Sequence, residues 1–132
     1  MADIQEVSHN FSTTNITLTT TTERIIISAP EIAVTRQTVF AMIIAWAQLL
    51  IGTDTTHIVP RVRRGTAITD TLIGEATSEE IKTAVGDREP FFLMVGEELS
   101  AVASVEYSFS LQQTLGSANG TAEQAAILVL LM

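Results

Sequence analysis

The chain has 132 residues, and its seven Lys and Arg stand against fifteen Asp and Glu, for a formal net charge of −8. Phosphate contacts need clustered Lys and Arg, so this acidic composition disfavours nucleic acid as a partner. The absence of cysteine excludes disulfides and thiolate metal ligands, so stability must come from packing or from oligomerisation.

Residues 1–14 are polar and weakly patterned, which predicts an N-terminal arm that lies on a neighbour or stays loose. The apolar side chains of this arm, Ile4, Val7 and Phe11, are candidates for docking to a partner. The segment has neither the basic nor the apolar region of a secretory signal, so we expect a mature cytosolic start.

Residues 15–132 are predicted to form a single domain of short strands. Ile16 and Leu18 alternate with Thr and Asn, and residues 24–28 carry three consecutive isoleucines, which suit a strand buried on both faces. The longest apolar run, residues 39–51, falls short of the ~20 residues that cross a bilayer, so we expect no membrane span.

The middle of the chain is predicted to form a hairpin followed by further strands. Residues 38–51 and 56–64 flank a Gly-Thr-Asp-Thr turn, which favours pairing between them. A loop bounded by Gly86 and Pro90 then precedes the wholly apolar segment 91–95, which we predict as a buried strand.

The clearest strand is residues 103–111, in which every odd position is apolar and every even position is Ser or Glu. Only an extended strand sends such alternating side chains to opposite faces. A last strand is predicted at about residues 122–131. Roughly eight to ten antiparallel strands, spaced by about a dozen residues, predict an all-β jelly roll or β-sandwich.

Three segments also fit a helix. Residues 39–51 are rich in Ala, Met and Leu, Thr77–Glu80 resembles a capping box, and residues 121–124 could begin a terminal helix. We favour strands because the connections around each segment are short, as in a meander or Greek key. For residues 77–85 and 121–131 both alternatives stay open.

No catalytic or cofactor constellation is recognisable. His9 and His57 are the two histidines, and neither belongs to a partner motif. The Ser, His and Asp residues are scattered, without the Gly-x-Ser-x-Gly turn of a serine hydrolase. No Asp-x-Asp-x-Asp series indicates calcium, and no phosphate-binding loop occurs. We therefore expect neither an enzyme nor a cofactor.

Arg61, Arg63 and Arg64 place three of the seven basic residues within one short stretch. One interpretation is a solvated strand face that balances nearby Glu. The other is a docking patch for an acidic partner, because Arg pairs bidentately with carboxylates. The acidic pairs at 79–80 and 97–98 are candidate partners of that patch across a subunit interface.

The strands carry more apolar residues than one core face can use. In residues 38–51 both alternating sets are hydrophobic, and segments 91–95 and 127–131 share this property. A small sandwich has one inner face per sheet, so the surplus predicts an outer face covered by another copy of the chain. The alternative is a tightly folded monomer with a few exposed leucines. The candidate interface residues are Phe40, Met42, Ile44, Trp46, Phe91, Leu128 and Leu130.

Most of the chain resembles a family of small phage virion proteins. The resemblance rests on Ile25–Ile27, on the Arg-Arg-Gly-Thr turn at 63–66, on Leu-Ile-Gly-Glu at 72–75, and on residues 107–113. It implies a single jelly roll, related in shape to tumour necrosis factor and complement heads, that forms homotrimers on the outside of a capsid.

The resemblance and the absence of catalytic residues predict a virion structural protein, either a capsid decoration or a minor capsid component. Its partners would be two further copies and the major capsid protein or another virion protein, and it would be made in the host cytoplasm. The alternative is a carbohydrate- or receptor-binding module of a fibre or spike. An adhesion module of a cell is a third possibility that the missing signal disfavours. Exposed aromatic side chains would distinguish the sugar-binding alternative.

Overall fold

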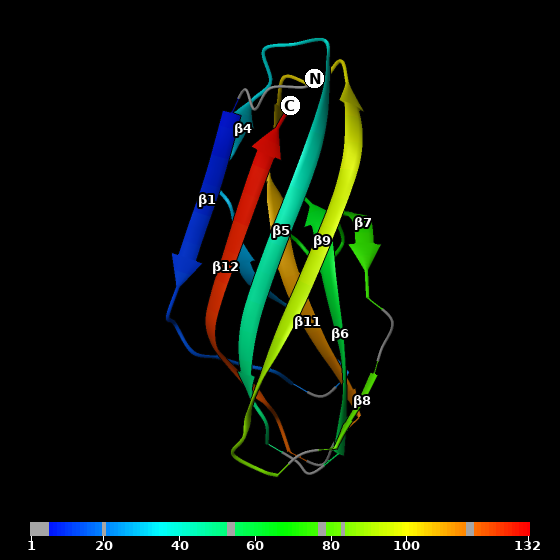
Figure 1. Ribbon diagram of the computed structural model, residues 1–132. Coiled ribbons are helices and arrows are strands. Elements are labelled where there is room, and N and C mark those ends of the chain that lie inside the picture. The colour runs from blue at the N-terminus through cyan, green and yellow to red at the C-terminus, as the bar shows by residue number, and fades with distance from the viewer. Residues whose placement is uncertain (1–5, 20, 53–54, 77–78, 83, 116–117) are drawn as a thin grey trace.

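Two antiparallel sheets pack face to face in the computed structural model (Figure 1), which describes residues 6–19, 21–52, 55–76, 79–82, 84–115 and 118–132. All secondary structure within these ranges is β. The predicted all-β sandwich is therefore confirmed. This class follows from the alternating and β-branched segments, because a strand buries one side chain in two.

The first sheet has the order β1-β12-β5-β9, and every pair in it is antiparallel. The two long central strands, β12 and β5, are paired on both sides, so their backbone groups are satisfied within the sheet. Its strands are β1 (Glu6–Ser12), β2 (Ile16–Thr17, paired with β12), β5 (Thr38–Leu50), β9 (Arg88–Ser100) and β12 (Thr121–Leu131).

The second sheet has the order β3-β11-β6-β7, and β8 pairs with the other end of β6. Two short strands, β4 and β10, form a separate ladder. These strands are β3 (Glu23–Ser28), β4 (Ile32–Ala33), β6 (Thr55–Arg64), β7 (Thr71–Glu75), β8 (Glu79–Lys82), β10 (Ser104–Val105) and β11 (Tyr107–Leu115).

The core lies between the sheets and follows the alternation of the sequence. Ile43 and Leu49 of β5 face it from the first sheet, and Tyr107 and Phe109 of β11 face it from the second; each is fully buried. The predicted strand at 103–111 is confirmed, although it is divided into β10 and β11.

The segments that also fitted a helix are strands where the structure describes them. Residues 39–50 belong to β5, residues 79–82 to β8, and residues 121–131 to β12. Their neighbours supply complete ladders, and tertiary pairing outweighs a weak helix propensity. Residues 77, 78 and 83 lie outside the described ranges.

The predicted hairpin of residues 38–51 with 56–64 is wrong. β5 pairs with β9 and β12 in the first sheet, whereas β6 pairs with β11, β7 and β8 in the second. The chain crosses between sheets after β5, and there Gly52 packs against the backbone carbonyl of Asn119, where a Cβ would collide. A short turn in the sequence therefore marks a change of sheet.

A separate N-terminal arm is not evident. Residues 6–12, placed in the predicted arm 1–14, form β1, which pairs along its whole length with β12. The weak hydrophobic pattern of this segment has a structural cause. Its inward positions are polar and its outward positions include Val7 and Phe11, the reverse of an ordinary edge strand.

Candidate functional site

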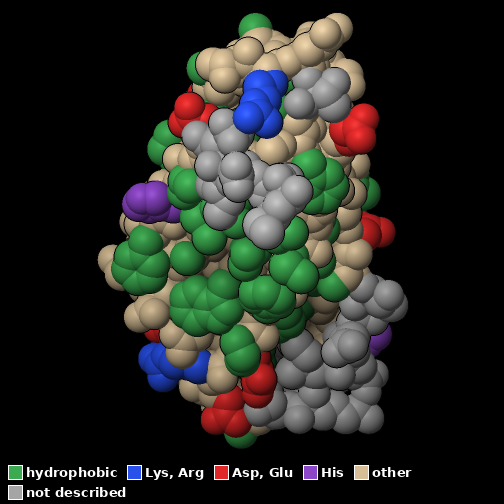
Figure 2. Space-filling view, turned by 45° about the horizontal axis from the view of Figure 1, so that its top comes forward, with side chains coloured by type: hydrophobic (Ala, Val, Ile, Leu, Met, Phe, Trp, Pro, Cys, Tyr) green, Lys and Arg blue, Asp and Glu red, His purple; other side chains and the backbone are tan. Residues whose placement is uncertain are grey.

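The outward face of the first sheet is covered with apolar side chains, as Figure 2 shows over β1, β12, β5 and β9. We call this surface the apolar platform. Its members share the outward phase of their strands and are Val7, Phe11, Phe40, Met42, Ile44, Trp46, Phe92, Met94, Ala126, Leu128, Leu130 and Met132.

Strand register arranges the platform in rows. Trp46 lies between Ala126 and Phe92, and the next row brings Ile44 between Leu128 and Met94. Residues opposite each other on neighbouring strands have Cβ atoms about 5 Å apart, so these side chains touch and form one continuous surface.

The platform is well exposed in the single chain. The exposed fraction is 61% for Phe11, 58% for Phe92, 57% for Met94, 51% for Val7 and 42% for Phe40. Monomeric proteins scatter single apolar residues over their surface, but a contiguous patch of large ones marks an interaction site.

β1 is held so that its apolar residues face outward. Ser8 is buried and donates its hydroxyl hydrogen to the carbonyl of Pro30 (2.7 Å), and Asn10 Nδ2 donates to the carbonyl of Ser28 (3.0 Å). A shift by one residue would send Val7 and Phe11 inward but would lose both hydrogen bonds. The hydrogen bonds of the inward Ser8 and Asn10 therefore fix the outward orientation of Val7 and Phe11.

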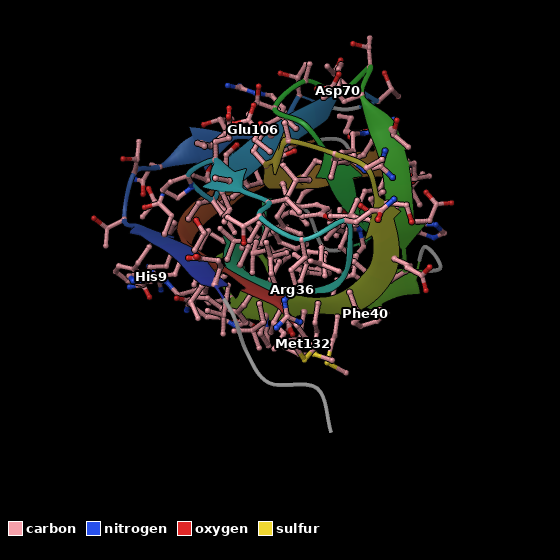
Figure 3. The ribbon with its side chains drawn as sticks, turned by 90° about the horizontal axis from the view of Figure 1, so that it is seen from above. His9, Arg36, Phe40, Asp70, Glu106 and Met132 are labelled. Atoms are coloured by element: carbon pink, nitrogen blue, oxygen red, sulfur yellow. The ribbon has the colours of Figure 1, made fainter. Side chains whose placement is uncertain are left out.

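The rim of the platform is polar. Gln48 pairs with Gln124 beyond the Trp46 row, and further on Arg88 Nε donates to Glu123 Oε1 at 2.7 Å. At the opposite end the exposed Glu98 lies opposite Phe40, whose ring covers Gly96 so closely that a Cβ there would be 2.5 Å from Cζ. Seen from above, Phe40 and Met132 project on the platform side, whereas Asp70 and Glu106 lie on the other side (Figure 3). An apolar centre with a polar rim is typical of protein interfaces.

The structure brings together six of the seven predicted interface residues. The platform contains Phe40, Met42, Ile44, Trp46, Leu128 and Leu130.

Phe91 is the exception. Its side chain is half-buried and packs against the core, so its placement on the interface is corrected. β9 buries its odd positions, as Leu99 (3% exposed) shows, and Phe92 takes the outward position. Because the segment 91–95 is apolar at every position, it contains no signal for its own phase. Phe92 and Met94 were missed for this reason.

The predicted docking residues of the N-terminus have different outcomes. Val7 and Phe11 belong to the platform through β1 and do not lie on a free arm. Ile4 lies outside the described residues.

Arg61 and Arg63 converge on one carboxylate of the second sheet. Arg63 Nε donates to Glu23 Oε2 (2.7 Å), and Arg61 Nη1 donates to Glu23 Oε1 (3.2 Å). Burial raises the pKa of Glu23, but hydrogen bonds from Arg63 and Ser110 outweigh it, so this pKa lies below its ordinary value. Arg61 also reaches Glu75 at 2.7 Å. This network occupies both guanidinium groups within the chain.

Arg64 joins the two sheets. Its Nε and Nη2 donate to the two oxygens of Glu97 at 2.8 and 2.6 Å. Tyr107 Oη donates to Glu97 Oε1 at 2.6 Å. Burial raises the pKa of Glu97, and the hydrogen bonds from Arg64 and Tyr107 lower it to below its ordinary value. The bidentate arrangement spans from β6 to β9.

These ion pairs favour the balanced strand face over the arginine docking patch, the two alternatives that the sequence left open. All three arginines bind carboxylates of their own chain, which matches the interpretation of a balanced strand face. Glu97 is engaged in the same way and is not a free partner for another subunit. For the pair at 79–80, only the strand position is described.

The described ranges hold no group of three or more His, Cys, Asp or Glu placed to bind a metal ion. His9 lies on β1 and His57 on β6, in different sheets. No helix that could span a membrane occurs in the part of the chain that the structure describes. The platform is therefore the candidate functional site.

Known proteins share the fold of this chain, but comparison of sequences assigns the chain to no family. No protein-family model matches the chain, and no curated protein matches it in sequence. The structure is similar to the Eiger TNF of S. frugiperda, with a TM-score of 0.56 and 10% identity over 96% of this chain and 91% of that chain.

Viral particles contain the same fold. A chain of the T13 particle of infectious bursal disease virus has a TM-score of 0.53 and 5% identity, over 98% of this chain and 32% of that chain. The Gx strain of that virus gives 0.54 and 7%, over 98% and 33%. This chain thus spans about a third of the viral chains. The shared fold is a TNF-like jelly-roll β-sandwich.

Proposed function

We propose that the protein is a homotrimeric structural component of a virion, and that the platform is the contact between its three copies. The observation that carries this proposal is the continuous apolar face of the first sheet, bounded by polar residues. TNF-like and virus-like jelly rolls are typically trimeric, which favours a second copy as the occupant.

The reversed polarity of β1 supports this occupant. Exposing Val7 and Phe11 to water has no benefit for a monomer, whereas each large apolar side chain contributes about 1.5–3 kcal/mol when it is buried. The platform members carry no charge, so like charges of two copies would meet only at its rim, where Glu98 lies opposite Phe40.

A three-fold ring needs two different surfaces on each copy, because its contacts are heterologous. The second surface that fits lies on β7, whose Gly74 packs against β9: a Cβ there would lie 2.5 Å from Val95 Cγ1. Leu72 of this strand and Ile68, which precedes it, are each 43% exposed. We infer that this edge of one copy covers the platform of the next copy, from β1 across to Phe92 and Met94 on β9.

The role on the particle is a decoration or minor capsid component that holds shell subunits together. The major capsid protein or another virion protein would be the partner, and the site of action would be the virion. The proposal includes no enzymatic activity and no cofactor. It is supported by the viral relatives of the fold and by a site made for protein contact.

The carbohydrate-binding alternative has one observation in its favour. Phe11, Trp46 and Phe92 lie on one row of the platform, and aromatic rings can stack on sugars. Gln48 and Gln124 lie in the next row on one side, but the rows toward Met132 are mostly hydrocarbon and thioether, with His9 at their β1 edge. Sugar recognition requires several polar groups that converge close to the rings. This pattern fits a protein partner better.

Light scattering tests the trimer with a matched pair of variants. Phe92→Asp should convert a trimer into a folded monomer, because Phe92 is 58% exposed and contributes little to the core. Val85→Asp alters an exposed residue (64%) outside the platform and should stay trimeric. A monomeric parent chain, or an unaffected Phe92→Asp trimer, would overturn the proposal. Circular dichroism verifies the fold of each variant.

Mixing two variants tests the ring geometry. Phe11→Asp disables the platform and Leu72→Asp disables the edge, so each alone should be monomeric. A mixture retains one intact contact per pair and should form a one-to-one dimer. A mixture that stays monomeric contradicts the assigned edge.

Cosedimentation tests the role on the particle. The trimer should cosediment with purified capsids and should bind no glycan array. Glycan binding without capsid binding would favour the alternative.

A further inference from the structure

We propose that the methionines of the platform are an oxidation site, at which a peroxide converts Met94 into a sulfoxide and thereby blocks assembly. This inference rests on the proposed trimer contact. It adds a modification site and the chemical class of its reagent, neither of which the contact requires.

The three methionines that the structure describes all lie on the platform. Met94 is opposite Ile44, Met42 lies between Leu130 and Gly96, and Met132 pairs with Phe40 through two backbone hydrogen bonds of 3.0 and 2.8 Å. Register therefore places Met42 diagonally between Met94 and Met132. The buried core, as described, contains none.

Met94 is the most accessible of the three. It is 57% exposed in the single chain, whereas Met42 and Met132 are half-buried. The chain has no cysteine, so no thiol competes for a peroxide, and the thioethers are its reactive sulfur atoms. Among the methionines that the structure describes, Met94 is thus the first sulfur that a peroxide meets on a free subunit.

The chemistry needs only hydrogen peroxide. The sulfur lone pair attacks one peroxide oxygen, the O–O bond breaks, and the sulfur keeps that oxygen as a sulfoxide. The other oxygen leaves as water. The sulfur is oxidised by two electrons and the peroxide is reduced by two.

A sulfoxide at this position is poorly suited to a covered surface. Its oxygen is a strong hydrogen-bond acceptor, and Trp46 carries the only N–H side-chain donor among the platform members. His9 lies in the same row as Met94 but three strands away, on β1. When a second copy covers the platform, the oxygen is buried without a partner, which opposes association. Assembly in turn covers Met94, so the trimer resists the reagent that inactivates the free subunit.

The experiment exposes dilute, dissociated protein to hydrogen peroxide, quenches it, concentrates it and measures its mass in solution. Peptide mass spectrometry should find one added oxygen on Met94 before Met42. The association constant should fall at least about tenfold. For Met94→Leu, whatever its association constant before treatment, that constant should not change on exposure to peroxide. Met94→Gln, a polar mimic of the sulfoxide, should be monomeric without peroxide.

The outcomes separate this inference from the proposed trimer. A parent chain that is monomeric at every concentration refutes the trimer and this inference with it. A trimer that forms equally well with oxidised Met94, or with Met94→Gln, overturns the oxidation site alone. Circular dichroism of Met94→Gln distinguishes loss of assembly from loss of fold.

Discussion

Tyr107 Oη donates a 2.6 Å hydrogen bond to Glu97 Oε1 and so links β11 of the second sheet to β9 of the first. The phenol is fully buried, and its acceptor is also held by Arg64. Burial and the adjacent carboxylate raise the pKa of Tyr107 well above its ordinary value of 10.0. This cross-sheet contact can be followed directly, because Tyr107 is the only tyrosine.

Alkaline titration should show no tyrosinate absorbance until the protein unfolds. The raised pKa of Tyr107 stabilises the fold fully below pH 10.0, and this contribution is lost as the pH rises further. Glu97→Gln removes the neighbouring charge and should bring the tyrosinate signal to lower pH. Glu98→Gln, on the exposed neighbour, should leave the titration unchanged. Equal curves for both variants would contradict the assignment.

Acid should destabilise the protein through Glu23 and Glu97. Each carboxyl has a pKa lowered from 4.5, so the folded chain holds fewer protons than the unfolded chain in this range. Their contribution is complete above pH 4.5 and is lost as the pH falls through the lowered values. Melting temperatures should drop below this pH, and the double variant Glu23→Gln/Glu97→Gln should show a shallower dependence. An unchanged slope would assign acid sensitivity to other carboxyls.

Alanine substitution should destabilise the protein at Ser110 but not at Ser108. Both are fully buried, but Ser110 donates to Glu23 Oε2 at 2.7 Å, whereas the Ser108 hydroxyl has no hydrogen-bond partner among the described residues. Ser110→Ala should reduce the free energy of unfolding by about 1.5–3 kcal/mol, the range for bonds to charged groups. Ser108→Ala should be neutral or stabilising. Chemical denaturation measures both; a greater loss at Ser108 would refute the prediction.

Alanine substitutions at Gly65 and Gly86 should distinguish the cost of backbone strain from the cost of a steric collision. Both have positive φ, 125° and 93°, which favours glycine. A Cβ at Gly65 would collide with the Asp70 carboxylate, which accepts a hydrogen bond from the Ala67 amide, but a Cβ at Gly86 would meet nothing within 4 Å. Gly86→Ala should cost about 1 kcal/mol, and Gly65→Ala should cost clearly more. Equal losses in thermal unfolding would remove Asp70 from the explanation.

The alternation of apolar residues in 103–111 predicted a strand, because a period of two is a local property that the sequence displays directly. Residues 38–51 are apolar in both alternating sets, and there the strand was predicted from the short connections around the segment. The surplus of apolar residues on β5 and β12 predicted a covered outer face, because the composition of a segment is also a local property. Six of the predicted interface residues lie together on the platform, because strand pairing places those positions of β5 and β12 on one outward face.

Where every residue of a strand is apolar, the sequence does not show which of the two alternating sets faces the core. Phe91 and Phe92 look equivalent in the sequence, and only pairing with β5 places Phe91 inward and Phe92 outward. In β1, polar inward residues concealed an outward apolar set. Sheet register selects one of two opposite faces, and that selection comes from neighbouring strands.

The sequence by itself determined the β class and the presence of an apolar surplus, since both follow from local composition and period. The tertiary structure decided which strands share a sheet, so β5 and β6 separate despite their short connection. It also decided the partners of Arg63 and Arg64, because Glu23 and Glu97 are distant in sequence and approach only when the sheets form. Such non-local pairings depend on the packing of the whole chain, which no local pattern records.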